Sequence, residues 1–340
     1  MNRFNLKHPV IQAPMAGSTP PEFVAAACRA GILGSLGAGY MTADKTRQAV
    51  RDIKSLTDRP FSVNLFVPEN PARNEQIIRA AHDALARYRE ELGLPGELPA
   101  FSDSEFDGQV QVLIDEGVPI ASFTFGLPDE SAVRALKAAG TYLIGTATTP
   151  EEAAAAEEIG MDAVVLQGKE AGGHRGAFLG EDRFMALSDL LAETGTAIPI
   201  IAAGGIHDAK TVRAALAAGA SAVQVGTALL IAEESGAHLL HKQAILDSRE
   251  GETVLTRAFS GKNARGVANR FIREMSKAPV APYPLQNDLT KPIRAAAGKQ
   301  GDAGLLSLWS GENGWRNEGG TVAEIVERLA AGTRECGAEA

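Results

Sequence analysis

The chain has 340 residues, of which 45% are hydrophobic and 22% charged, so its composition is that of a folded globular protein and excludes a mostly disordered one. A formal net charge of −9 argues against nucleic acid as a partner, because polyphosphate backbones attract basic proteins. No apolar leader precedes Val10, and no run approaches the roughly 18 apolar residues that cross a bilayer. Cys28 and Cys336 are too few and too far apart for a zinc site or a disulfide framework. These features favour a cytoplasmic α/β protein with no metal site and no membrane partner.

Short β-rich apolar runs alternate with helical patterns along the chain, which indicates a parallel sheet. Eight strands are expected, at His8 to Gln12, Ile32 to Leu36, Phe61 to Leu65, Ile120 to Phe123, Tyr142 to Ile144, Ala163 to Leu166, Pro199 to Ala202 and Ala222 to Val225. Helices are expected between them, at Ala43 to Leu56, Glu130 to Ala139, Glu151 to Ile159 and Ala209 to Ala218. Eight such units predict a closed (β/α)8 TIM barrel with its active site at the C-terminal strand ends.

Two segments interrupt this alternation. Residues 68–117 separate the third and fourth strands, and two helices are expected there, over Asn74 to Leu92 and Asp103 to Glu116. Residues 231–304 show no clear strand pattern and predict a mostly helical cap on the substrate side, inserted after strand eight. The amphipathic stretch Thr321 to Ala331 then fits the closing barrel helix. We therefore expect a cofactor-binding barrel over residues 1–230 and 305–340, and a cap over residues 231–304.

The segment that follows the sixth predicted strand is the most informative. The strand delivers Gln167 to the barrel rim, and Gly172 and Gly173 then allow backbone amides to approach a ligand. His174 comes next and could exchange a proton with that ligand. The alternative is a flexible glycine loop with an incidental histidine.

Glycines also follow the last two predicted strands. Gly204 and Gly205 come after strand seven, and Gly226 and Thr227 come after strand eight. Barrel loops at these two positions commonly bind phosphate through backbone N–H groups and a helix N-terminus. Ordinary turns are the alternative reading.

Two other strand ends could border a flat ring. Small residues and a rigid proline occupy Ala13, Pro14 and Met15 after the first strand. Asn64 ends the third strand, and its amide offers both a donor and an acceptor, as a flavin edge requires. Asn64 could instead be a turn residue.

These segments resemble the class I nitronate monooxygenases, an FMN-dependent (β/α)8 family. The matching stretches are Gln12 to Gly17, Asn64 to Pro68, Ser122 to Gly126, Gln167 to Gly176, Ala202 to Ile206, Gln224 to Thr227, Thr256 to Gly261, Ala264 to Gly266, Asn269 to Phe271 and Tyr283 to Gln286. The resemblance covers nearly the whole chain. One departure is Ser18-Thr19 after Gly17, where family members often carry a further glycine.

The resemblance implies FMN as cofactor and His174 as the active-site histidine. It implies FMN contacts at Ala13, Pro14, Met15, Asn64, Gln167, Gly172, Gly173, Gly204, Gly205, Gln224, Val225, Gly226 and Thr227. The implied activity is oxidation of alkyl nitronates, such as propionate 3-nitronate, by O2 to a carbonyl compound and nitrite. It would begin with single-electron transfer to the flavin and need no NADH or NADPH. An imidazolium at His174, helped by Arg175, would then stabilise the anionic nitronate.

Two alternatives stay open, namely an NAD(P)H-dependent flavin reductase for enoyl-acyl-carrier-protein or quinones, and a non-catalytic flavin-binding protein. A homodimer is also left open. Among other residues, His238 and His241 are expected on a solvated helix face, and Trp309 as a packing anchor. The basic residues Arg257, Lys262, Arg265 and Arg270 form either a solvated face or a site for a phosphate or carboxylate.

Overall fold

The computed structural model describes residues 4–331 and 333, so Cys336 lies outside the described residues. Eight parallel strands form one sheet in the order β1-β9-β8-β6-β5-β4-β3-β2. They are β1 (Val10–Gln12), β2 (Gly34–Gly37), β3 (Phe61–Phe66), β4 (Ile120–Thr124), β5 (Tyr142–Ala147), β6 (Ala163–Gln167), β8 (Ile200–Ala203) and β9 (Ala222–Val225). The sheet closes because Leu33 N–H donates to the Val10 carbonyl at 3.0 Å and Gln12 N–H donates to the Leu33 carbonyl at 2.9 Å. The predicted (β/α)8 barrel is confirmed.

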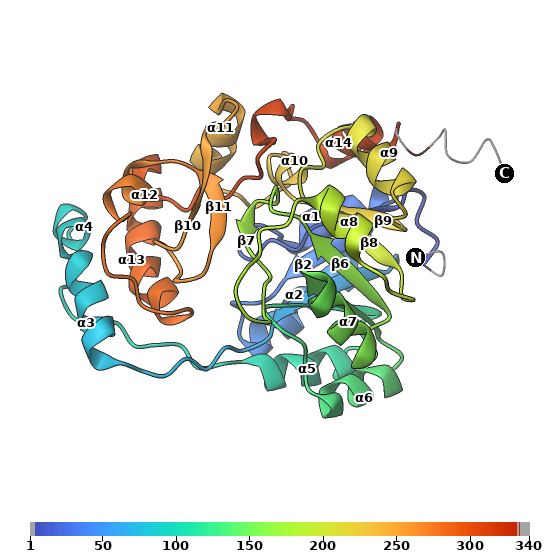
Figure 1. The fold of residues 1–340 in the computed structure, drawn as a ribbon, viewed down its shortest axis with the longest axis horizontal. Helices are drawn as coiled ribbons and strands as arrows, with labels where there is room; N and C mark the ends of the chain where they lie inside the picture. The colour runs from blue at the N-terminus through green and yellow to red at the C-terminus, as the bar shows by residue number, and fades with distance from the viewer. Residues whose placement is uncertain (1–3, 332, 334–340) are drawn as a thin grey trace.

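Helices surround the strands on the outside of the barrel (Figure 1). They are α1 (Pro21–Arg29), α2 (Ala43–Leu56), α5 (Phe106–Asp115), α6 (Glu130–Ala138), α7 (Pro150–Glu158), α8 (Leu187–Glu193), α9 (Ala209–Ala217) and α14 (Val322–Ala330). Capping side chains define where several of these helices begin. Thr42 accepts from Lys45 N–H at the start of α2, and Asp208 and Thr321 form capping boxes at the starts of α9 and α14. Because α14 packs against both α1 and α9, it stands in the place of the eighth barrel helix.

Buried hydrophobic side chains fill the interior of the barrel away from the C-terminal ends of its strands. Ile11, Leu33, Ile144, Val165 and Ile201 belong to one buried cluster whose members come from strands around the barrel. Such a packed layer makes the barrel interior a core and not a pore. A ligand can therefore enter only from the C-terminal side of the strands.

The segment between β3 and β4 contributes helices both to the region outside the barrel and to the barrel itself. The helix expected over Asn74 to Leu92 is broken at Leu85 into α3 (Glu75–Ala84) and α4 (Ala86–Glu91). These helices share a hydrophobic cluster with α12 (Arg270–Glu274) and α13 (Leu285–Gln300), and all four lie to one side of the barrel in Figure 1. The second expected helix is α5, which packs between α2 and α6 as the third barrel helix.

Residues 231–304 contain α11 (Leu239–Asp247), α12 and α13, but also two strands that the sequence pattern did not indicate. Strands β10 (Thr253–Thr256) and β11 (Ala264–Val267) are antiparallel, and β11 pairs in turn with β7 (Gly173–His174). The strand β11 is buried throughout, so it lacks the alternation of polar and apolar residues that would reveal a strand. The two short strands add to the mostly helical cap that the sequence predicted.

None of the helices in the described part of the chain is long and apolar enough to span a membrane.

Candidate active site

A cavity of about 1360 Å³ opens at the C-terminal ends of the barrel strands. Most of the residues expected at the cofactor site line it: Ala13, Pro14, Met15, Asn64, Gln167, Gly172, Gly173, Gly204, Gly205, Gln224, Gly226 and Thr227. His174 lines it as well. Val225 differs, since its side chain packs in the core behind the strand while its carbonyl accepts from Ala13 N–H at 2.9 Å.

His174 stands on β7, and its backbone pairs with Ala264 of β11. Three aromatic rings surround the imidazole, with centroid separations of 5.7 Å to Phe125, 6.2 Å to Tyr283 and 5.3 Å to Trp309. Trp309 is therefore more than the packing anchor that the sequence indicated, because it also lines the cavity. The rings fix the imidazole at the wall between the barrel and residues 231–304.

A hydrogen bond connects His174 to Ser260. The imidazole Nε2 lies 2.8 Å from the Ser260 hydroxyl oxygen. That oxygen also accepts from Lys262 N–H at 3.3 Å and lies 3.2 Å from the Lys262 carbonyl oxygen. Ser260 therefore links the imidazole to the backbone of Lys262.

The imidazole is neutral at physiological pH. Burial, together with the nearby cations Arg294 and Lys262, lowers the pKa of His174 to about 3. The sequence led us to expect an imidazolium at His174, and this expectation is wrong. The charged ring would lose its hydration and would lie near the positive charges of Arg294 and Lys262.

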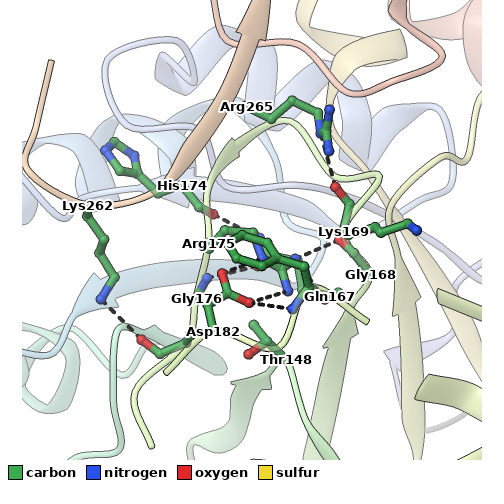
Figure 2. A network of polar contacts seen from close by, with 12 residues as sticks. Thr148, Gln167, Gly168, Lys169, His174, Arg175, Gly176, Asp182, Lys262 and Arg265 are labelled. Atoms are coloured by element: carbon green, nitrogen blue, oxygen red, sulfur yellow. Dashed lines mark hydrogen bonds and ion pairs between the residues drawn. The ribbon is translucent and has the colours of Figure 1, made fainter. Parts of the chain in front are cut away.

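Arg175 does not reach the cavity, contrary to the expectation that it assists His174. Its side chain is 1% exposed and forms an ion pair with Asp182 at 3.0 Å. It also donates to the Gln167 and Gly168 carbonyls at 3.0 and 2.7 Å. Figure 2 shows the guanidinium among these groups and the His174 ring pointing away from them. Arg175 is therefore a structural residue of the loop that carries His174.

Gln167 joins β6 to the same loop. Its Nε2 donates to the His174 carbonyl at 3.0 Å, and its Oε1 accepts from Gly176 N–H at 2.8 Å (Figure 2). Both ends of the amide are occupied, so the side chain fixes the backbone on either side of Arg175. It does this while lining the cavity.

The two glycine turns also line the cavity. Gly204 has φ +117° and a Cβ there would lie 3.2 Å from the Ala171 nitrogen, so only glycine fits. Thr227 Oγ1 accepts from Gly311 N–H at 3.0 Å, and Asn313 donates to the Gly205 carbonyl at 3.0 Å. Gly311 and Asn313, in the segment before α14, are thus hydrogen-bonded to both turns. The sequence pattern did not indicate this contact.

Asn64 and Gln224 present polar groups from the strands. Asn64 lies within β3 and not in a turn, and its Nδ2 donates to Ser122 Oγ at 3.0 Å and Thr124 Oγ1 at 3.1 Å. Its Oδ1 makes no hydrogen bond with any described residue, nor does the Gln224 amide. Both therefore retain polar atoms for a ligand.

Each of the four basic residues Arg257, Lys262, Arg265 and Arg270 contacts another group of the protein. Lys262 forms an ion pair with Glu69, Arg265 with Glu312 and Arg270 with Glu91. Arg257 donates to the Gly261 carbonyl at 2.9 Å. These four side chains form neither a solvated face nor an anion site together.

Some cavity residues lie outside the segments that the sequence indicated. Tyr40 and Arg294 line the cavity, as does Tyr283 from the family-matching stretch Tyr283 to Gln286. His238 and His241 also line it. The expected solvated helix face is wrong for His241, which is buried and whose Nε2 lies 2.8 Å from the Trp309 carbonyl oxygen, whereas His238 is exposed. Within residues 4–331 and 333, no group of three His, Cys, Asp or Glu side chains could hold a metal ion.

The chain matches the family model for nitronate monooxygenase over residues 1–332. It belongs to the nitronate monooxygenase family. It is 44% identical over 328 residues to a probable nitronate monooxygenase of Bacillus subtilis (strain 168), with 92% of each chain covered. A crystal structure of nitroalkane oxidase from Streptomyces ansochromogenes is 41% identical, covers 97% of both chains and superposes with a TM-score of 0.92. FabK from Thermotoga maritima is 29% identical, with a TM-score of 0.77 over 98% of this chain and 95% of that one.

Membership confirms the family resemblance and shows that the chain is an enzyme of the nitronate monooxygenase family. The alternative of a non-catalytic binding protein is therefore excluded.

Proposed function

We propose that this nitronate monooxygenase family member uses FMN to oxidise alkyl nitronates with O2 to a carbonyl compound and nitrite, without NADH or NADPH. One observation carries the proposal: in a chain of this family, a half-buried, neutral imidazole shares one cavity with two glycine turns suited to a phosphate.

The chemistry of the lining fits FMN. The turns at Gly204 and Gly226 place backbone N–H groups at strand ends, where a barrel commonly binds phosphate. Asn64 and Gln224 keep amide atoms free for the polar edge of a flavin. The cavity of about 1360 Å³ exceeds the roughly 300–1,000 Å³ of ordinary ligand pockets, so a cofactor and a small substrate can share it. We propose that Ala13, Pro14, Met15, Gln167, Gly172, Gly173, Gly205 and Thr227 complete the cofactor site.

When bound, FMN supplies the single-electron acceptor for nitronate oxidation. His174 contacts the substrate in this proposal. The Ser260 hydroxyl holds the imidazole through Nε2, and His174 would orient the bound nitronate by hydrogen bonding and exchange a proton with its oxygen. The aromatic rings of Phe125, Tyr283 and Trp309 exclude water from around the imidazole.

The test begins with the visible spectrum and flavin content of the purified protein. The FMN-loaded protein is then mixed anaerobically with propionate 3-nitronate in one sample and with NADH in another. We expect a spectral change with the nitronate and none with NADH. A colourless protein that FMN cannot reconstitute would contradict the cofactor.

A flavin reductase dependent on NAD(P)H is the second candidate. The similarity to FabK over 98% of this chain favours testing it. Bleaching of the flavin absorbance by NADH, with no response to the nitronate, would establish this candidate in place of the first.

A further inference from the structure

Phe125 has a backbone conformation that bulky residues rarely adopt. Its φ is +72°, in the left-handed region, and it follows directly after the last residue of β4. A residue with a side chain is strained there, because its Cβ crowds a neighbouring carbonyl oxygen. Among the residues other than glycine with a positive φ in the described part of the chain, Phe125 alone lines the cavity. Strain of this kind persists only where surrounding contacts hold it, and it is concentrated at functional sites.

The left-handed backbone decides on which side of the strand the ring lies. Successive side chains of a strand point to opposite faces. Ser122 and Thr124 of β4 line the cavity, whereas Ala121 and Phe123 belong to the hydrophobic cluster that the strands share with α2, α5 and α6. Continued alternation would place Phe125 in that outer cluster as well. Because the chain turns at φ +72°, the ring of Phe125 lines the cavity instead.

Other side chains hold the Phe125 ring in this position. The residue is 3% exposed. Its ring lies 4.6 Å from that of Phe66 and 5.1 Å from that of Tyr283, measured between centroids. It makes a T-shaped contact with the His174 imidazole, with a centroid separation of 5.7 Å and an interplanar angle of 82°. A ring packed in this way gives the imidazole a fixed surface to lie against.

The same ring also binds a cation that is connected to His174. The Lys262 ammonium lies over the Phe125 ring, 4.9 Å from its centroid, and the face of an aromatic ring attracts a cation. The backbone N–H of Lys262 donates to the Ser260 hydroxyl at 3.3 Å, and that oxygen lies 2.8 Å from His174 Nε2. Phe125 therefore supports the imidazole directly and also through Lys262 and Ser260.

We propose that Phe125 is a positioning residue for His174, and that its left-handed backbone is what places the ring against the imidazole. This inference rests on the proposed nitronate oxidation, in which His174 contacts the substrate. A packed ring limits rotation of the imidazole, so the orientation of His174 is set before the substrate binds. Loss of the ring should therefore lower turnover more than it weakens substrate binding.

The experiment replaces two phenylalanines that lie on opposite faces of one strand. For Phe125→Leu in FMN-loaded protein we expect kcat with propionate 3-nitronate to fall about tenfold, with KM nearly unchanged. Phe125→Tyr keeps the ring and should recover most of the rate. Phe123→Leu is the matched control, because Phe123 is 0% exposed and does not line the cavity. It should lower the thermal stability as Phe125→Leu does but leave kcat unchanged.

Phe125→Gly separates the effect of the ring from that of the backbone. Glycine adopts φ +72° without strain, so this variant should fold even if Phe125→Leu does not. It should nevertheless lose kcat about tenfold, because the ring is absent. Nitrogen NMR of labelled histidine gives a readout that is independent of activity. The His174 signals should broaden in Phe125→Leu and Phe125→Gly, where the imidazole can exchange between orientations, and stay narrow in Phe123→Leu.

Equal changes of kcat in Phe125→Leu and Phe123→Leu would overturn the positioning role of Phe125. So would a loss that appears only as a raised KM, or narrow His174 signals in Phe125→Gly. Wild-type protein that oxidises no nitronate would instead overturn the proposed function. In that case the NMR comparison would still decide whether Phe125 positions the imidazole.

Discussion

The His174 imidazole and the Ser260 hydroxyl are hydrogen-bonded at 2.8 Å, and this contact joins the loop after β6 to residues 231–304. Ser260 is itself held by Lys262, whose N–H donates to the same hydroxyl at 3.3 Å. The serine therefore positions the imidazole.

Removal of this hydroxyl should impair the reaction without unfolding the protein. For Ser260→Ala we expect kcat/KM for propionate 3-nitronate to fall about fivefold, since one hydrogen bond contributes about 1 kcal/mol. The measurement is the initial rate of oxygen consumption. Ser276→Ala removes an exposed hydroxyl that bonds only within its own turn, and should have no effect. An unchanged rate in Ser260→Ala would show that the contact does not position His174.

The protonation state of His174 can be measured directly. Burial is the main cause that lowers its pKa to about 3, so the imidazole should remain neutral from pH 5 to pH 8. Nitrogen NMR of protein with labelled histidine would report this, and His174→Asn identifies the signal by its loss. A His174 signal that titrates near pH 6.5 would contradict the assignment.

The buried ion pair of Arg175 and Asp182 should stabilise the fold. Arg175→Met leaves Asp182, which is 6% exposed, without its partner, and we expect the free energy of unfolding to fall by about 3 kcal/mol. Arg183→Met breaks an exposed ion pair with Glu151 in the same region and should cost less than about 1 kcal/mol. Urea denaturation measures both. Equal effects in the two variants would contradict a structural role for Arg175.

The glycine turn after β8 should be essential for the cofactor. Gly204→Ala introduces a Cβ 3.2 Å from the Ala171 nitrogen at φ +117°, so we expect FMN affinity to fall at least about tenfold. Gly140→Ala also has a positive φ, of +83°, but its Cβ would meet nothing within 4 Å and it does not line the cavity. It serves as the control for backbone strain alone. Quenching of FMN fluorescence gives the dissociation constants. Equal dissociation constants for the Gly204→Ala and Gly140→Ala variants would contradict the proposal that this turn binds FMN.

His241 should make stability depend on pH. Burial lowers its folded-state pKa to about 4, below the roughly 6.5 of an unfolded histidine. The unfolded state therefore binds more protons between these values, and the free energy of unfolding falls as pH decreases from 6.5 to 4. Between pH 7 and pH 5 this one residue should cost about 2 kcal/mol, which His241→Gln would remove. If the free energy of unfolding fell equally between pH 7 and pH 5 in the wild type and in His241→Gln, the lowered pKa of His241 would be contradicted.

The barrel could be predicted from the sequence because each strand is a short apolar run between helical patterns. The predicted strand Phe61 to Leu65, for example, corresponds to β3 within one residue. The residues that line the cavity from strand ends could be placed in the same way, since parallel strands bring their carboxyl ends together. Gln167 and His174 belong to this group.

The remaining features depend on contacts between distant segments. Strand β11 pairs with His174 across about ninety residues, and no local pattern marks so short a buried strand. Arg294 lies in the middle of an ordinary helical sequence, and only the packing of α13 shows that it faces the cavity. The pKa of His174 likewise follows from burial and from cations that fold in from elsewhere.

The most direct test of the account is the rate of nitrite release from propionate 3-nitronate by FMN-loaded protein in air, without NADH, in wild type and in His174→Asn. We predict rapid nitrite formation by the wild type and a loss of at least about 100-fold in kcat/KM in the variant, within the range for removal of a proton-transfer group. No nitrite from the wild type, or equal rates in the two proteins, would contradict the proposal that this cavity oxidises nitronates at His174.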